Sequence, residues 1–140
     1  MFLRCITILV CILMQPLTGG ILPNSKVTPG DIDKVVMTDW VCNKQVDDLP
    51  IYKRDIVIAF RHYGVDVNDK NYRLDRLVPI NLGGTNNVKN LWPMKATDFY
   101  KKKAVEKDLF RCICNGFISL KEAQKVLITN WESWNIDSLK

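Results

Sequence analysis

Two adjacent glycines, Gly83 and Gly84, separate two short apolar stretches in the middle of the chain. The first stretch, 74–82, alternates apolar and polar residues, and the second, 88–92, follows a polar turn. This pattern predicts two short strands joined by a Gly-Gly turn. Pro79 cannot donate a backbone hydrogen bond, so the first strand is expected at a sheet edge or a bulge. A helix-forming segment comes next, which predicts the order strand, turn, strand, helix and an α+β fold.

Two long helices are predicted on either side of this centre. The first, 51–63, is expected to stop at Gly64. The second, 97–114, is expected to stop at Asn115-Gly116. Its apolar side is predicted to carry four residues: Tyr100, Ala104, Leu109 and Ile113.

Two further helices are predicted nearer the ends of the chain. A short one covers 31–38, with Thr28 as its N-cap and Pro29 at its first position. The last one begins at Ser119, because Ser119 and Glu122 have the spacing of a capping box. We expect it to continue to Trp131. The hairpin and its helix are thus flanked by helices on both sides in sequence.

The first twenty residues have the order of a signal peptide, which is a basic start, an apolar run and a small polar exit. An N-terminal core helix is the alternative interpretation. If 1–20 is removed, 21–30 reads as a linker and 31–140 as a single domain. We therefore expect an exported protein, periplasmic or secreted, in a compartment where disulfides form.

The chain has a formal net charge of +5, from 20 basic and 15 acidic residues. This mild excess is compatible with nucleic acid or another anionic partner but does not require one. An ordinary solvated Lys-rich helix face is the alternative. The basic residues predicted to form one nucleic-acid-binding surface are Arg73, Arg76, Lys101, Lys102, Lys103 and Lys107.

The stretch 72–93 contains a set of residues with specific spacing: Asp75, Leu77, Pro79, Leu82, Gly83, Gly84, Asn90, Leu91, Trp92 and Pro93. In these residues it resembles a small exported bacterial group of HNH endonucleases, with their ββα-metal fold. The resemblance implies that Asp75 is a metal ligand for Mg²⁺ or Mn²⁺, together with a residue of the following helix. It also implies that Asn90 holds the loop that carries the catalytic His.

The residues that carry the chemistry of that family are replaced. The position of the catalytic His is Arg76, whose guanidinium stays protonated and cannot act as a base. On the helix, Tyr100 stands for a His and Lys103 for an Asp. A missing general base lowers the rate by about 10²–10⁴-fold. His62, the single His of the chain, lies where the family has no catalytic residue, so we expect no nuclease activity and no bound cofactor.

Three cysteines remain if the leader is removed: Cys42, Cys112 and Cys114. Members of the family often pair a Cys in the N-terminal part with one just before a Gly near the C-terminus. The resemblance therefore implies a disulfide between Cys42 and Cys114. Cys112 is expected to be a small buried apolar residue.

These observations predict a monomeric exported HNH-like protein that has lost catalysis and acts by binding nucleic acid or another anionic partner. One alternative is a secreted effector acting on a host protein or membrane, with Trp131 and Trp134 as candidate anchors. Another is an active endonuclease with an atypical site. In that case Asp75 and Asp98 would hold a metal ion that activates water by itself.

Overall fold

A computed structural model describes residues 22–43, 49–135 and 137. The predicted signal peptide lies outside this part of the chain. The fold is α+β, with a two-stranded antiparallel sheet among helices. The elements are α1 (Thr38–Asn43), α2 (Lys53–His62), β1 (Tyr72–Arg76), β2 (Leu91–Lys95), α3 (Ala96–Cys114) and α4 (Leu120–Thr129), with short 3₁₀ helices η1 (Ile80–Leu82), η2 (Val88–Asn90) and η3 (Trp131–Ser133).

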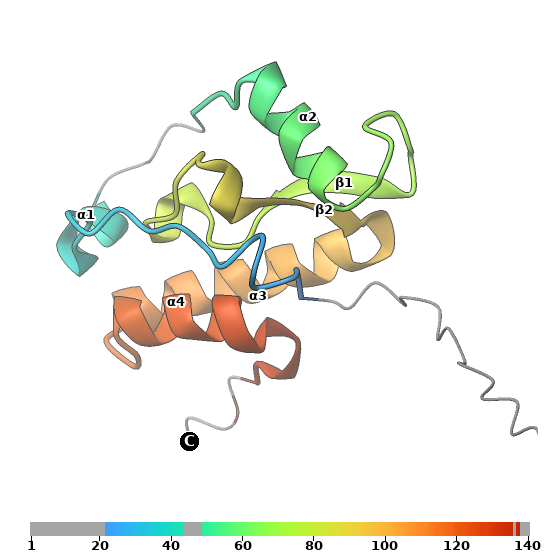
Figure 1. Ribbon diagram of the computed structural model, residues 1–140. Helices are drawn as coiled ribbons and strands as arrows, with labels where there is room; N and C mark the ends of the chain where they lie inside the picture. The colour runs from blue at the N-terminus through green and yellow to red at the C-terminus, as the bar shows by residue number, and fades with distance from the viewer. Residues whose placement is uncertain (1–21, 44–48, 136, 138–140) are drawn as a thin grey trace, which may run out of the picture.

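The hairpin lies between helices (Figure 1). α2 contacts β2 from one side, α3 packs on both strands, and α4 packs against α3 beyond the sheet. In the register of the two strands, Tyr72 pairs with Lys95 and Asp75 pairs with Trp92. Because β2 leads directly into α3, the first turns of α3 lie beside β1.

The connection between the strands differs from the predicted Gly-Gly turn. β1 ends at Arg76, and Pro79 is the N-cap of η1 rather than a strand residue. Gly83 has a positive φ of 85°, which ends η1. At Gly84 the reason for glycine is a close approach, because a Cβ would lie 1.8 Å from the carbonyl oxygen of Val78. The loop therefore folds back on itself instead of continuing the ladder.

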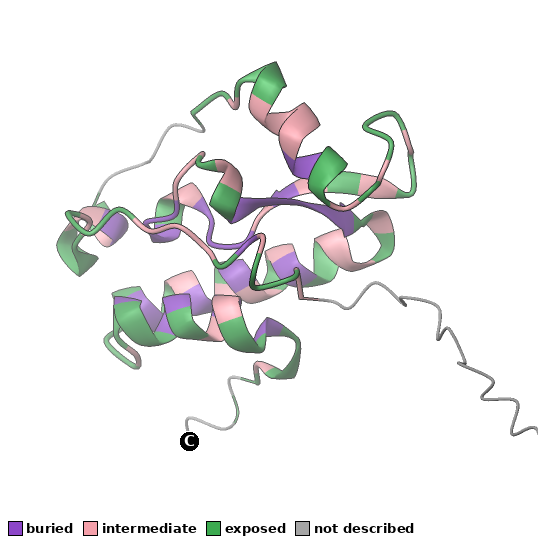
Figure 2. Cartoon of the chain, in the orientation of Figure 1, coloured by how far each residue is buried: buried purple, intermediate pink, exposed green. Residues whose placement is uncertain are grey.

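The core lies between the sheet, α3 and α4 (Figure 2). Leu109 and Ile113 of α3 are buried as expected, whereas Tyr100 and Ala104 are exposed. The predicted capping box at the start of α4 is present, with the Ser119 and Glu122 side chains each bonded to the other's backbone N–H. The core residues are Val41, Val78, Leu82, Trp92, Met94, Leu109, Ile113, Leu120, Ala123, Leu127 and Trp131.

The predicted helix over 31–38 is wrong, since α1 begins only at Thr38. The backbone of the preceding segment bonds instead to the loop between the strands. Gly30 N–H donates to the carbonyl of Lys89 (3.0 Å), and Ile32 forms a β-bridge with Gly84.

Thr28 is accordingly not a helix cap. It is fully buried, and its hydroxyl lies 2.7 Å from the Tyr63 hydroxyl. Residues 22–30, the described part of the stretch read as a linker, thus include a segment that packs on the domain. Burial raises the pKa of Tyr63, and the hydrogen bonds with the Thr28 hydroxyl and from the Asn24 backbone N–H offset this effect only in part.

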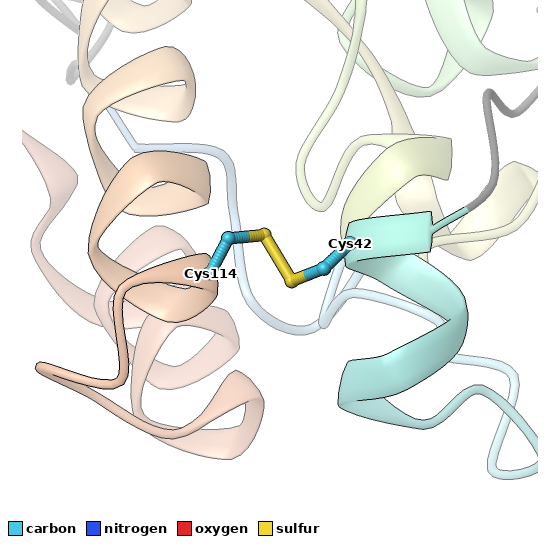
Figure 3. The surroundings of a disulfide bond; sticks show 2 residues. All are labelled: Cys42 and Cys114. Carbon is cyan, nitrogen blue, oxygen red and sulfur yellow. A yellow bond between two sulfur atoms is a disulfide. The ribbon is translucent and has the colours of Figure 1, made fainter.

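A disulfide joins Cys42 at the end of α1 to Cys114 at the end of α3, confirming that pairing (Figure 3). It closes a separation of 72 residues. Such a bridge stabilises by about 4 kcal/mol when its effect on the unfolded chain is estimated from loop length. Cys112 is free and buried, as expected. Within the described residues no helix combines the length and apolar character needed to cross a membrane.

Candidate functional site

Four charged side chains form a cluster where β1 meets the first half of α3. We call Asp75, Lys102, Lys103 and Glu106 the charge cluster. Asp75 is contributed by β1, and the other three lie on consecutive turns of α3. Two carboxylates and two ammonium groups make the cluster formally neutral. This neutrality is the condition under which buried charges are tolerated.

Lys102 is the centre of the charge cluster. Its side chain is fully excluded from solvent. Its Nζ lies 2.8 Å from Asp75 Oδ2, 2.6 Å from Glu106 Oε1 and 2.8 Å from the carbonyl oxygen of Arg76. These three acceptors match the three protons of an ammonium group. Lys102 therefore cannot belong to the predicted nucleic-acid-binding surface.

Lys103 closes the outer side of the charge cluster, with its side chain 39% exposed. Its Nζ donates to Glu106 Oε2 (2.8 Å) and lies 3.5 Å from Asp75 Oδ1. Partial burial acts to lower the pKa of Lys103, but the charges of Glu106 and Asp75 outweigh it and raise the pKa above its ordinary value. Lys103 is thus held as a cation beside both carboxylates.

The Asp75 carboxylate is excluded from solvent, and its two oxygens have different surroundings. Oδ2 accepts from the indole Nε1 of Trp92 (3.0 Å) as well as from Lys102. Oδ1 has no hydrogen-bond partner among the described residues, with Lys103 as its ion-pair partner.

These residues do not fit the divalent ion that the HNH resemblance implies. Asp75 already faces two ammonium groups, and a third cation there would meet their repulsion. Tyr100 carries a phenol rather than a carboxylate or imidazole. The Asp98 carboxylate is paired, with its Oδ1 3.5 Å from Lys101 Nζ. In the described part of the chain, no group of three or more His, Cys, Asp or Glu side chains could hold a metal ion.

Arg76 has a structural role at the position of the family's base. Its Nε donates to Asn86 Oδ1 (2.8 Å), and an Nη donates to the carbonyl of Leu49 (2.9 Å). The guanidinium therefore ties the segment before α2 to the loop between the strands. Its predicted role in nucleic-acid binding is weakened, because these donors are already used by the protein.

Asn90 holds the loop, as its predicted scaffold role requires, although it ends η2 rather than lying in β2. Its side chain is completely buried. Nδ2 donates to the carbonyls of Val78 and Thr85 (2.8 Å each), and Oδ1 accepts from the backbone N–H of Val78 (3.0 Å). One amide thus fixes both ends of the turn that contains Gly83 and Gly84.

Part of the predicted basic surface remains exposed along α3. Residues spaced by three or four positions share one helix face, so Lys103 and Lys107 line up with Arg111. Arg111 was not among the predicted residues, although this spacing is visible in the sequence. We call Tyr100, Lys103, Lys107 and Arg111 the α3 stripe.

Arg73 of β1 lies at the N-terminal end of the α3 stripe. Its guanidinium carbon is 5.3 Å from the ring centroids of both Phe99 and Tyr100. Cation–π contacts of this kind fix the direction of a long side chain. Lys101 is also exposed, but it pairs with Asp98 and lies on another face of the helix.

A cavity of about 360 Å³ borders the charge cluster. A larger groove of about 930 Å³ lies elsewhere, between residues 30–38 and the start of α4. His62 is exposed on α2 and does not line either. The lining of the smaller cavity consists of Leu49, Pro50, Ile51, Ile56, Leu74, Asp75, Arg76, Phe99 and Lys103.

Comparison with protein-family models, with curated proteins and with solved structures found no match to this chain. The resemblance to HNH endonucleases therefore rests on the residues of 72–93 alone.

Proposed function

We propose that the protein is an exported HNH-like scaffold that has lost nuclease chemistry and acts by binding an anionic partner, with nucleic acid as the first candidate. One observation carries this proposal: the Asp75 carboxylate is held by the ammonium groups of Lys102 and Lys103. A one-metal nuclease needs that carboxylate for a divalent cation. Here the ammonium groups of these two lysines already neutralise the site.

Displacement of these lysines by a metal ion is energetically opposed. Lys102 is fully buried, so removing its ammonium from Asp75 and Glu106 would leave Lys103 alone to compensate two buried carboxylates. Breaking a buried ion pair in this way typically costs about 3–5 kcal/mol. Mg²⁺ also gives up its hydration water reluctantly. The second requirement, a base, is absent at Arg76 because guanidinium offers no lone pair.

The binding side of the proposal is supported by the α3 stripe and Arg73. Lys103 and Arg111 are eight residues apart, a length of roughly 12 Å along a helix axis. Side chains at this spacing can contact several successive phosphates of one strand. Arg73 is pre-oriented by two aromatic rings, which reduces the entropy lost when it binds.

Export is supported by the disulfide between Cys42 and Cys114. Disulfides persist in oxidising compartments and are rare where thiols are kept reduced. Together with the predicted leader, this bond favours a periplasmic or secreted location.

The alternatives receive less support from the described residues. Trp131 is 2% exposed and Trp134 donates to Asp108 Oδ2 (2.9 Å), so both tryptophans serve the fold rather than a partner or a membrane. An atypical nuclease using Asp75 and Asp98 would need carboxylates that each face a lysine.

The test is fluorescence anisotropy with labelled DNA over a range of salt concentrations. The double variant Lys107→Gln/Arg111→Gln removes two charges from the α3 stripe. Lys121→Gln/Lys125→Gln removes the same charge from exposed positions of α4. We expect wild-type affinity to fall steeply with salt, and the log–log slope to drop by about 2 only in the first double variant.

Two results would overturn the nucleic-acid proposal. One is undetectable binding at low salt. The other is an equal loss in both double variants, because net charge alone would then explain the attraction.

A further inference from the structure

The cavity beside the charge cluster combines apolar walls with a small polar end. Its apolar lining includes Ile56 of α2, Leu74 of β1 and Phe99 of α3. Its polar lining is Asp75, Arg76 and Lys103. A volume of about 360 Å³ lies at the lower end of the range of small-molecule pockets. A cavity of this size and lining favours a compact, largely apolar group with one polar edge.

The polar end has an unmet hydrogen-bonding requirement. Asp75 is 2% exposed and lines the cavity, and its Oδ1 has no hydrogen-bond donor within the described residues. The ion pair with Lys103, at 3.5 Å, satisfies this buried acceptor only in part, and an incompletely satisfied buried acceptor is unfavourable. A donor brought by a ligand would complete the hydrogen bonding of this oxygen.

The neighbouring charges define what kind of donor fits. Lys103 Nζ lies 3.5 Å from Asp75 Oδ1, and Lys102 holds the other oxygen of the same carboxylate. A cationic donor would be repelled by both ammonium groups. A neutral N–H is therefore favoured, and an acceptor next to it could bond to Lys103, which has three protons to donate.

We propose that this cavity receives one unpaired nucleobase. Nucleobases are compact planar rings whose hydrogen-bonding edges place an N–H donor beside an acceptor. The donor would bond to Asp75 Oδ1 and the acceptor to Lys103 Nζ. Arg73 contacts Phe99, which lines the cavity, so the phosphate next to an inserted base has a cation within reach.

This inference rests on the proposed function in one respect: the strand that supplies the base is the strand that contacts the α3 stripe. The inference adds a preference for single strands over duplex. In a duplex the same base edge is used in pairing and is reached only after unstacking, which is unfavourable. The protein should therefore bind single strands more tightly than duplex of the same length.

The first experiment compares three fluorescent oligonucleotides of equal length on the wild-type protein: an intact single strand, a fully abasic strand and a duplex. We expect the intact strand to bind at least about tenfold more tightly than the abasic strand, because base contacts typically contribute that much affinity. Equal affinity for the intact and abasic strands would overturn base insertion while leaving phosphate binding in place.

Cavity-filling variants locate the effect. Ile56→Trp fills the cavity from α2, whereas Val57→Trp, one residue on, lies at a different depression on the surface. Ile56→Trp should bind intact and abasic strands alike, and Val57→Trp should keep the preference of the wild type. A retained preference in a folded Ile56→Trp protein would contradict the proposal.

A titration with uridine tests the cavity in the wild-type protein, without any substitution and without phosphate contacts. Nuclear magnetic resonance on the labelled wild-type protein should show shifts centred on Leu74 and Phe99. The absence of shifts there at millimolar uridine would overturn the inference. Uridine shifts without oligonucleotide binding would instead support the cavity and refute the proposed nucleic-acid function.

Discussion

Lys102 reaches from α3 to Asp75 on β1 through a 2.8 Å ion pair in which both side chains are completely excluded from solvent. Lysine is rarely buried to this degree unless it is paired. The pair connects the strand to the helix at the position where the HNH resemblance implies a metal ion. The cluster around this pair is thus both part of the core and the reason we expect no metal-dependent cleavage.

Replacement of Lys102 by Met should destabilise the protein strongly. Lys102→Met keeps an apolar stem of similar length but removes the buried ammonium, so that Lys103 alone compensates the charges of Asp75 and Glu106. We expect a loss of about 3–5 kcal/mol in the free energy of unfolding, measured by urea denaturation. Lys107→Met, on the exposed side of the same helix, should change it by no more than about 0.5 kcal/mol. Similar losses in both variants would show that the buried pair is not specifically important.

Gly84 should not tolerate any side chain. The Cβ of Gly84→Ala would lie 1.8 Å from the Val78 carbonyl oxygen, so the loop held by Asn90 would have to move. We expect the variant to lose most of its stability or to fail to fold. Gly64→Ala is the control, because a Cβ there meets nothing within 4 Å and only the positive φ of 64° is unfavourable.

The Gly64→Ala control should cost about 1–2 kcal/mol. Thermal unfolding followed by circular dichroism separates the two variants. A Gly84→Ala protein as stable as Gly64→Ala would mean that the loop between the strands is differently arranged.

The capping box of α4 should make stability depend on acid pH. The backbone N–H of Ser119, and then its hydroxyl, donate to Glu122 and lower its pKa below the ordinary 4.5. For a lowered pKa, the stabilisation is complete above about 4.5 and is lost as the pH falls through the folded-state value.

The advantage of wild type over Glu122→Gln in melting temperature should therefore be constant near neutral pH and shrink as the pH falls below 4.5. Ser119→Ala removes the hydroxyl donor but keeps the backbone N–H, so it should weaken this dependence only in part. An advantage that stays constant down to pH 3 would argue against an ionised cap.

The three longer helices were predictable because local signals fix them. Gly64 has a positive φ after α2, and the Ser119–Glu122 pair begins α4, as expected. The bounds of α3 differ from the prediction by one residue at its start. These signals act within one or two turns, so sequence alone carries them.

The loop between the strands was not predictable in the same way. An alternating pattern over 74–82 favours a strand, but Pro79 cannot donate and Asn90 takes the backbone groups of Val78. That competition depends on a side chain twelve residues away from Val78. Only the folded chain brings the two together.

The structure divides the predicted basic residues into a buried one and exposed or partly exposed ones, a division that the sequence did not predict. Lys102 was grouped with exposed lysines because lysine is usually exposed, and its partner Asp75 lies on another element. The i,i+4 spacing of Lys102 and Glu106 was the available signal. It could not indicate burial, since the same spacing also occurs on solvated helix faces.

The most direct test of the central claim is a plasmid-nicking assay on the mature, oxidised protein with Mg²⁺ or Mn²⁺. It is run beside Arg76→His and beside the triple variant Arg76→His/Tyr100→His/Lys103→Asp. The account predicts that wild type does not nick above the background of a metal-free control. It also predicts that Arg76→His alone stays inactive, because Lys103 remains beside Asp75. Metal-dependent nicking by wild type, abolished by EDTA, would contradict the account, because two lysines would then not prevent Asp75 from serving a metal ion.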